Sequence, residues 1–136
     1  EMGADGVIVS NHGGRQLDHG RATIDVLPEI VETVGGRAEI VLDGGIMRGS
    51  DVLKAIALGA TAVTIGKLQG WGLAAAGQVG LVRVLELLEN EITTTMGLLG
   101  VTRLDQLTSA HLCKVKPLGP THEMSAFIHM PGGQLL

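Results

Sequence analysis

Three short runs of consecutive apolar residues, many of them β-branched, are spaced along the first half of the chain. They are GVIVS at residues 6–10, EIVLD at residues 39–43 and TAVTIG at residues 61–66. Runs that are apolar on successive positions, rather than on alternate ones, are typical of strands buried on both faces, as in a parallel sheet. The pattern therefore predicts three parallel strands.

Segments whose apolar residues recur at helical spacing separate these runs. The first, TIDVLPEIVETVGG, has Thr23 as its expected N-cap and Gly35 at its end. The second, SDVLKAIALGA, has Ser50 as its expected N-cap, Asp51 near the positive end of the helix dipole and Gly59 as terminator. The predicted order is therefore strand, helix, strand, helix, strand.

The second half of the chain is predicted to be helical and then irregular. A long helix with one apolar stripe is expected over residues 74–99. The segment GVTRLDQL is expected to form a short helix with Thr102 and Asp105 as a capping box. From residue 108 onward no period is sustained, so we divide the chain into a partial barrel at residues 1–107 and an extended tail at residues 108–136.

Alternating strands and helices with short connections predict an α/β fold with a parallel sheet and right-handed crossovers. Three such strands fit either an open doubly wound sheet or a barrel, and ligands bind at the C-terminal ends of the strands in both. Those ends carry Asn-His-Gly-Gly-Arg at 11–15, Asp-Gly-Gly at 43–45 and Gly-Lys at 66–67. The polar residues that bear chemistry are therefore expected at one edge of the sheet.

Composition narrows the classes of partner. The net charge is −4 and the ten basic residues are scattered, so nucleic acid is not expected as a partner. Cys113 is the only cysteine, which excludes an internal disulfide, and the histidines outside the strand ends lack metal-ligand spacing. No signal peptide and no uninterrupted apolar run of about 18 residues is apparent, so we expect a cytoplasmic protein without membrane contact.

The glycine-bearing loops after the second and third strands suggest an anion site. Such loops expose backbone N–H groups, and in barrels a phosphate commonly binds at the loops that follow the last two strands. A phosphate-bearing ligand with Arg48 or Lys67 as counter-charge is one interpretation. The other is that Gly44, Gly45 and Gly66 only permit tight turns, and the spacing leaves both open.

His12 and Arg15 form the second candidate pair. A histidine at a strand end can act as a general base near neutral pH, and an arginine three residues later offers a planar fork for a carboxylate. The alternative is a loop histidine bonded to backbone groups beside a solvated arginine. Spacing alone does not decide between them.

Three segments carry a resemblance to a known family. They are SNHGGRQLD at residues 10–18, DGGIMRGSDVLKAIALGATAV at residues 43–63 and IGK at residues 65–67. Together they closely resemble the C-terminal half of the FMN-dependent 2-hydroxy acid oxidoreductases, which include glycolate oxidase, lactate oxidase and mandelate dehydrogenase. The resemblance covers about residues 3–107, and SNHGGRQLD is the segment that singles out this family among phosphate-binding barrels.

This resemblance implies a fold, a cofactor and roles for individual residues. The fold would be a (β/α)8 TIM barrel, with FMN as cofactor and a small 2-hydroxy acid as the substrate that is oxidised to a 2-oxo acid. His12 would be the base, His12 and Arg15 would bind the substrate, and Ser10 would contact the flavin side of the site. The FMN ribityl chain and phosphate would be held by Asp43, Gly44, Gly45, Ile46, Met47, Arg48, Gly66 and Lys67.

The sequence departs from the family pattern at two positions of the phosphate site. The family usually has arginine where Met47 stands, and arginine followed by proline where Lys67 and Leu68 stand. Loss of a bidentate arginine removes a charge-assisted pair, although Lys67 retains a point charge and Arg48 is a possible substitute.

The larger departure concerns extent. A (β/α)8 barrel takes about 250 residues, whereas this chain has three strands, which resemble the sixth to eighth, and it contains no tyrosine. We therefore expect a portion of a larger protein that is homo-oligomeric at full length, with the isolated chain inactive. Two alternatives stay open: a non-catalytic fragment that persists by pairing with a complementary chain or with itself, and another phosphate-binding barrel that acts on a nucleotide or diphosphate.

Overall fold

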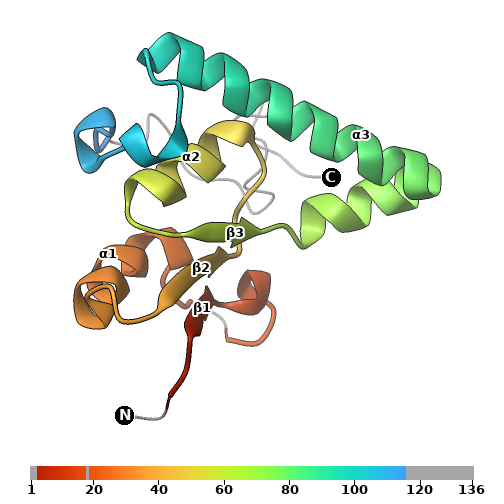
Figure 1. Ribbon diagram of the computed structural model, residues 1–136. Helices are drawn as coiled ribbons and strands as arrows, with labels where there is room; N and C mark the ends of the chain where they lie inside the picture. The colour runs from red at the N-terminus through yellow and green to blue at the C-terminus, as the bar shows by residue number, and fades with distance from the viewer. Residues whose placement is uncertain (1–2, 18, 116–136) are drawn as a thin grey trace.

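The computed structural model describes residues 3–17 and 19–115 and has the predicted order of parallel strands and intervening helices (Figure 1). The strands are β1 (Gly6–Ser10), β2 (Glu39–Asp43) and β3 (Ala62–Thr64), and they lie side by side in the order β1-β2-β3. β3 is shorter than the predicted 61–66 because Thr61 belongs to the incoming turn and Gly66 is already the N-cap of the next helix. All strands are parallel, as predicted.

Successive rows of side chains across the sheet point to opposite faces. One row consists of Val9, Leu42 and Val63, and the next consists of Ser10, Asp43 and Thr64. The first row belongs to the hydrophobic core, whereas the second lies on the other face at the carboxyl ends of the strands. Register therefore places three polar side chains in line at the edge where ligands bind in parallel sheets.

Two helices supply the rest of that core. Helix α1 (Thr23–Val34) packs against β1 and β2, and α2 (Gly49–Ala57) packs against β3. Leu27 of α1 and Leu42 of β2 are completely buried where the layers meet. The helices thus cover one face of the sheet and leave the polar row on the other.

Both predicted N-caps are wrong by one or two positions. Ala22 precedes α1, so Thr23 lies inside the first turn, where it is buried and its hydroxyl donates to the carbonyl of Gly44. Arg48, rather than Ser50, is the N-cap of α2. At α1 a hydrogen bond to a distant part of the chain replaces the local cap, because Thr23 is engaged by the loop after β2. At α2 the cap is local but begins two residues earlier than predicted. The Asp51 carboxylate accepts the Arg48 backbone N–H at 3.0 Å.

Helix α3 (Lys67–Leu99) begins earlier than the predicted residue 74 and is broken near its first third. Ala76 and Gly77 have non-helical backbone angles, and Gly77 (φ 57°, ψ −137°) occupies a region open essentially to glycine. The two segments fold back on one another at the right of Figure 1. A Cβ on Gly80 would lie 2.0 Å from the carbonyl oxygen of Gly72, so the hairpin depends on glycine at this crossing.

Two short 3-10 helices follow, η2 (Leu104–Gln106) and η3 (Ser109–His111). The predicted capping box is wrong at both positions: Arg103, not Thr102, is the N-cap, and Gln106 Oε1, not Asp105, accepts the backbone N–H groups of Thr102 and Arg103. Asp105 instead forms an ion pair with Arg103. Leu107 is buried against α2. Most of the expected tail, residues 116–136, lies outside the described residues, and the division at residue 107 stays a prediction.

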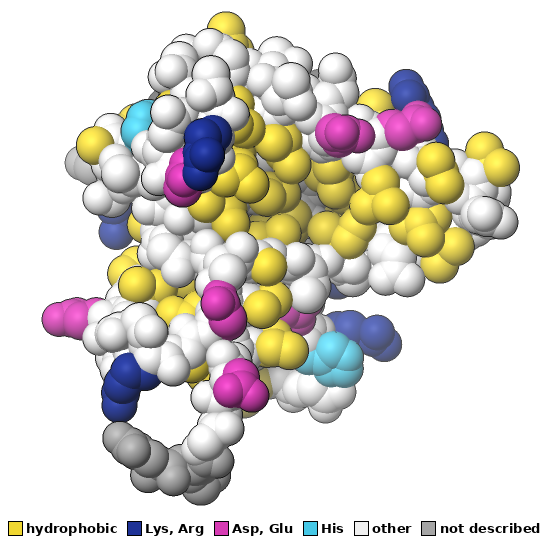
Figure 2. All heavy atoms as spheres, viewed as in Figure 1, with side chains coloured by type: hydrophobic (Ala, Val, Ile, Leu, Met, Phe, Trp, Pro, Cys, Tyr) yellow, Lys and Arg dark blue, Asp and Glu magenta, His cyan; other side chains and the backbone are white. Residues whose placement is uncertain are grey.

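By length and composition alone, α3 is long and apolar enough to cross a membrane. Its second segment, residues 78–99, carries four charged residues, so any window of 18 residues with at most two charges includes the break. Only 11% of the apolar window is buried. Figure 2 shows apolar side chains gathered in a hollow between α3 and the sheet and along the outer end of the hairpin.

Candidate active site

A hydrogen-bonded row crosses all three strands at their carboxyl ends. The Ser10 hydroxyl donates to Asp43 Oδ2 at 2.5 Å, and the Thr64 hydroxyl donates to Asp43 Oδ1. Asp43 is half-buried, whereas Ser10 and Thr64 are exposed on the side not covered by helices. Each carboxylate oxygen therefore already holds one hydroxyl from a neighbouring strand.

His12 lies next to this row in the 3-10 turn η1 (His12–Gly14). Its backbone is left-handed, with φ 53°, and its N–H donates to the Ser10 hydroxyl at 3.0 Å. The exposed imidazole lies with Nδ1 at 3.1 Å from the side-chain nitrogen of Gln16. Because an amide nitrogen only donates, Nδ1 is the acceptor in this contact and the neutral ring carries its proton on Nε2, for which no hydrogen bond is found among the described residues.

Arg15 closes the same turn. Its backbone N–H donates to the carbonyl of His12 at 3.3 Å, which holds the two residues on one turn of chain. Its exposed side chain forms no ion pair within residues 3–17 and 19–115. An exposed guanidinium that forms no such ion pair is available to bind an anionic ligand.

The loop after β2 is shaped by two glycines and one apolar anchor. Gly44 and Gly45 have φ of 101° and 81°, and a Cβ on Gly44 would lie 2.8 Å from Asn11 Oδ1. Ile46 is 5% exposed and packs into the core, so only its backbone faces the site. Only glycine therefore fits at residue 44, where the loops after β1 and β2 touch.

A small hollow of about 220 Å³ lies beside this contact, between the strand ends and the first turns of α1 and α2. Asn11, Gly44 and Lys54 are among its lining residues. Asn11 Oδ1 is buried there without a hydrogen-bond partner among the described residues. The hollow is small, and the polar row lies outside it.

The basic residues expected at a phosphate divide into two groups. Lys67, the first residue of α3, donates from Nζ to the carbonyl of Gly13 at 3.1 Å and so joins the third strand end to the histidine loop. Arg48 instead forms an ion pair with Glu91 of α3 at 2.8 Å. Met47 donates its backbone N–H to Asp51. Lys67 is thus brought to the site, whereas Arg48 is held against α3.

The Asp43 carboxyl is electrostatically stabilised in its ionised form. The hydrogen bond from Ser10, then that from Thr64, holds the pKa of Asp43 below its ordinary value; partial burial opposes this effect, and the proximity of His12 adds a still smaller lowering. Hydrogen bonding to a carboxylate favours its charged form in general. Asp43 is therefore an anion at neutral pH.

Sequence reasoning did not identify three residues of this arrangement: Thr64, Gln16 and Asn11. Thr64 lies within a strand that is otherwise apolar, and its contact with Asp43 depends on the register of β2 and β3. Gln16 lies four residues after His12, a spacing that carries meaning only once the chain turns at η1. The one available signal was that Ser10, Asp43 and Thr64 each stand near the end of a predicted strand.

Residues 1–114 match the family of FMN-dependent dehydrogenases. This match covers most of the chain. The chain belongs to this family. Among individual relatives, it is 54% identical over 112 residues to the peroxisomal (S)-2-hydroxyacid oxidase GLO3 of Arabidopsis thaliana, covering 82% of this chain and 31% of that protein. It is 51% identical over 112 residues to the L-lactate oxidase of Nostoc sp., covering 82% of this chain and 31% of that protein.

Solved structures of FMN-dependent family members agree with this assignment. A mandelate oxidase structure superposes with a TM-score of 0.74 at 52% identity, covering 77% of this chain and 32% of that one. The three parallel strands and their helices match a portion of these TIM-barrel oxidases, which confirms the predicted fold class. The chain spans about a third of the length of the relatives it matches.

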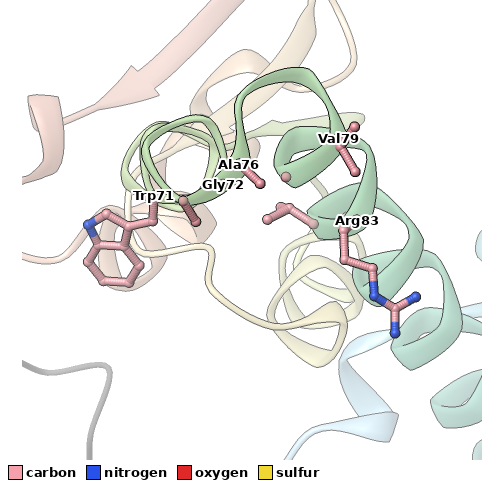
Figure 3. Close-up of a pocket in the computed structure, with 8 residues that line it drawn as sticks. Trp71, Gly72, Ala76, Val79 and Arg83 are labelled. Carbon is pink, nitrogen blue, oxygen red and sulfur yellow. The ribbon is translucent and has the colours of Figure 1, made fainter.

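A second cavity lies away from the strand ends, in the α3 hairpin (Figure 3). It measures about 460 Å³ and lies between the two segments, with Trp71, Val79 and Arg83 among its lining residues. Its walls are almost wholly apolar, and it is widely open to solvent. Nothing in it resembles the polar arrangement on the sheet edge, and we assign the chemistry to that edge. No cluster of three or more His, Cys, Asp or Glu side chains that could hold a metal occurs in the described part of the chain.

Proposed function

We propose that this chain carries the catalytic base, the carboxylate-binding arginine and the FMN-binding loops of an enzyme that oxidises a 2-hydroxy acid to a 2-oxo acid. The observation that carries the proposal is that His12 and Arg15 share one turn at the carboxyl end of β1 in a chain of this family. Relatives are named as 2-hydroxyacid, lactate and mandelate oxidases. Family membership favours this function over a nucleotide- or diphosphate-using barrel.

Arg15 would bind the substrate carboxylate and fix its orientation, because a guanidinium forms two parallel hydrogen bonds with a carboxylate. His12 would then accept the hydroxyl proton at Nε2 in the tautomer that carries its own proton on Nδ1, which requires the Gln16 amide to turn so that its oxygen, and not its nitrogen, faces Nδ1. Bound FMN supplies the redox chemistry by accepting the two electrons released from the substrate carbon. Two protons and two electrons leave the alcohol in all: the hydroxyl proton would go to His12, and the electron pair together with the hydrogen of the substrate carbon would go to FMN. The protein's own part is to orient the substrate and take the hydroxyl proton.

The residues at the strand ends fit FMN. Asp43 is a carboxylate at the place where a polyol chain would pass, and each of its oxygens accepts one hydroxyl already and has a lone pair left. The backbone N–H groups of Gly45 and Ile46 have no acceptor among the described residues, and Lys67 lies at the third strand end. We propose that these groups, with Ser10, Gly44, Met47 and Gly66, hold the ribityl chain and phosphate. Arg48 would join them only by leaving Glu91.

The test uses a chimera in which residues 1–114 replace the matching segment of the Nostoc L-lactate oxidase. Anaerobic bleaching of the flavin is followed after addition of glycolate, lactate or mandelate. Because general bases contribute about 100-fold or more to such rates, His12→Ala is expected to slow bleaching by at least that factor while the chimera stays yellow.

The matched control is His111→Ala, which removes a histidine of η3 that is not among the residues lining the hollow at the strand ends. It should leave the bleaching rate unchanged. Equal bleaching rates for His12→Ala and the parent chimera would refute the role of His12. A parent chimera that binds FMN and bleaches with none of the three acids would refute the proposed function. The cytoplasmic location and the homo-oligomer expected from the sequence stay predictions.

A further inference from the structure

Thr64 is the outermost member of the polar row and has no role in the function proposed above. It is paired with Asp43 in the register of β2 and β3, and its hydroxyl donates to Asp43 Oδ1 across the strands. The side chain is exposed on the face away from α1 and α2, so it contributes nothing to the core there. Its hydrogen bond to Asp43 is therefore the main interaction that the hydroxyl makes.

The direction of each hydrogen bond in the row is fixed by chemistry. An ionised carboxylate only accepts, so Thr64 and Ser10 must both donate their single hydroxyl protons to Asp43. The Ser10 oxygen is then left with lone pairs alone, and it accepts the backbone N–H of His12 at 3.0 Å. The hydrogen bonds therefore connect Thr64 to Asp43, Asp43 to Ser10, and Ser10 to the backbone N–H of His12.

The residue at the end of this order is held in an unfavourable conformation. A left-handed backbone at a residue other than glycine is costly, and His12 adopts it with φ 53°. Its N–H has Ser10 as partner, so the position of the Ser10 oxygen bears directly on the position of His12. Asp43 in turn fixes that oxygen, and Thr64 fixes the second oxygen of Asp43.

We propose that Thr64 is a positioning residue for His12, acting through the Asp43 carboxylate and the Ser10 hydroxyl. Without the Thr64 hydroxyl, the carboxylate is free to rotate about its Cβ–Cγ bond and the Ser10 oxygen loses its fixed acceptor. The backbone of His12 then samples other conformations. The consequence for catalysis rests on the function proposed above, whereas the hydrogen-bonded order itself does not.

The experiment compares Thr64→Val with Thr64→Ser in the full chain by NMR, without flavin. Thr64→Val keeps the shape and removes the hydroxyl, and Thr64→Ser restores it. Loss of one hydrogen bond is expected to speed hydrogen exchange of the His12 amide about five-fold in Thr64→Val. The carboxyl carbon of Asp43 should titrate at higher pH in that variant, and both signals should return to the parent values in Thr64→Ser.

Thr61→Val is the matched control. Thr61 also places a hydroxyl between β2 and β3, but it accepts the backbone N–H of Ile40 at the opposite end of the strands. This variant should leave the His12 amide and the Asp43 titration unchanged. The proposal is wrong if Thr64→Val behaves like Thr61→Val, or if Thr64→Ser fails to restore both signals.

A second readout separates this proposal from the proposed function. In the lactate oxidase chimera, Thr64→Val should lower kcat for flavin reduction several-fold with little change in KM, because Arg15 is untouched. A chimera that never bleaches, combined with the expected NMR shifts, would refute the function and leave the positioning role intact. Normal bleaching in Thr64→Val with the NMR shifts absent would refute the positioning role alone.

Discussion

His12 combines a strained backbone with a ring whose one hydrogen-bond partner in the described part of the chain is Gln16. Left-handed residues other than glycine cost on the order of 1–3 kcal/mol and persist only where their surroundings determine them. Here the surroundings are the N–H bond to Ser10 and the turn closed by Arg15. We interpret this strained backbone conformation as fixing the direction of the His12 side chain.

Met47 stands in the proposed phosphate site at a position where the family pattern has a positive charge, and Met47→Arg is expected to raise the affinity for FMN. A charge-assisted hydrogen bond contributes about 1.5–3 kcal/mol, so the dissociation constant should fall about ten-fold or more. The measurement is flavin fluorescence titration of the apo chimera with FMN and, in parallel, with riboflavin. The gain should vanish with riboflavin, which has no phosphate.

Met47→Gln serves as the control, because it has similar length and no charge. It should bind FMN as the parent does. An equal gain for both variants, or a gain with riboflavin, would show that the loop after β2 affects the flavin in some way other than through phosphate charge.

At this scale the sequence predicts part of the site. Ser10, His12 and Asp43 were identified from SNHGGRQLD and DGG, and the structure brings them together. Thr64 and Gln16 were not identified, because their contacts arise from strand register and from the η1 turn. The ion pair that holds Arg48 was missed for the same reason, since Glu91 lies far along the chain on α3.

The α3 hairpin depends on two glycines in contact. Gly80→Ala would place a methyl group against the Gly72 carbonyl and force the segments apart. Such overpacking costs about 1–3 kcal/mol, so the free energy of unfolding should fall by that amount. Urea denaturation followed by circular dichroism measures it.

Gly97→Ala is the matched substitution in the same helix, where an added Cβ meets nothing within 4 Å. Alanine has the higher helix propensity, so this variant should gain about 0.5–1 kcal/mol. A loss in Gly97→Ala as large as that in Gly80→Ala would mean that the hairpin crossing has no special requirement for glycine.

Among the elements, strands were predicted better than helix ends. Each apolar run forms a strand, because strands of a buried parallel sheet need apolar residues at successive positions whatever the flanking sequence. The start of α3 was misplaced because the glycine-rich stretch at residues 66–77 has the local composition of a loop. Packing between the two segments overrides that propensity, and the glycines that suggest a loop are the residues that allow the segments to approach.

At the scale of the molecule, residues 3–17 and 19–115 leave the sheet with two unpaired edges and a face that no helix among them covers. β1 and β3 each have one neighbour, and Ile8 of β1 is 66% exposed. Unpaired edges and exposed apolar patches favour association with other chains. The chain spans about a third of the relatives' length, so we expect the isolated chain to be inactive and to self-associate through this sheet.

Ile8→Lys is expected to shift the isolated chain toward monomer, because a charge on an edge strand disfavours strand pairing. Size-exclusion chromatography with light scattering over a range of concentrations measures the shift. Leu98→Lys is the control, since Leu98 is 84% exposed on α3, away from the sheet. Equal effects of the two variants would place the association elsewhere, and a monomeric, yellow parent chain would contradict the expectation altogether.

Two proton acceptors stand close together at the strand ends, and the hydrogen-bonded row makes them chemically unequal. Asp43 is tied on both oxygens and stays charged, so it is a poor destination for a proton from a ligand. The imidazole of His12 keeps one lone pair in its neutral form, and that lone pair is not engaged by the row. A proton released by a ligand at the strand ends would therefore go to His12. Asp43, which could compete for that proton, instead holds the neighbouring hydroxyl groups in place.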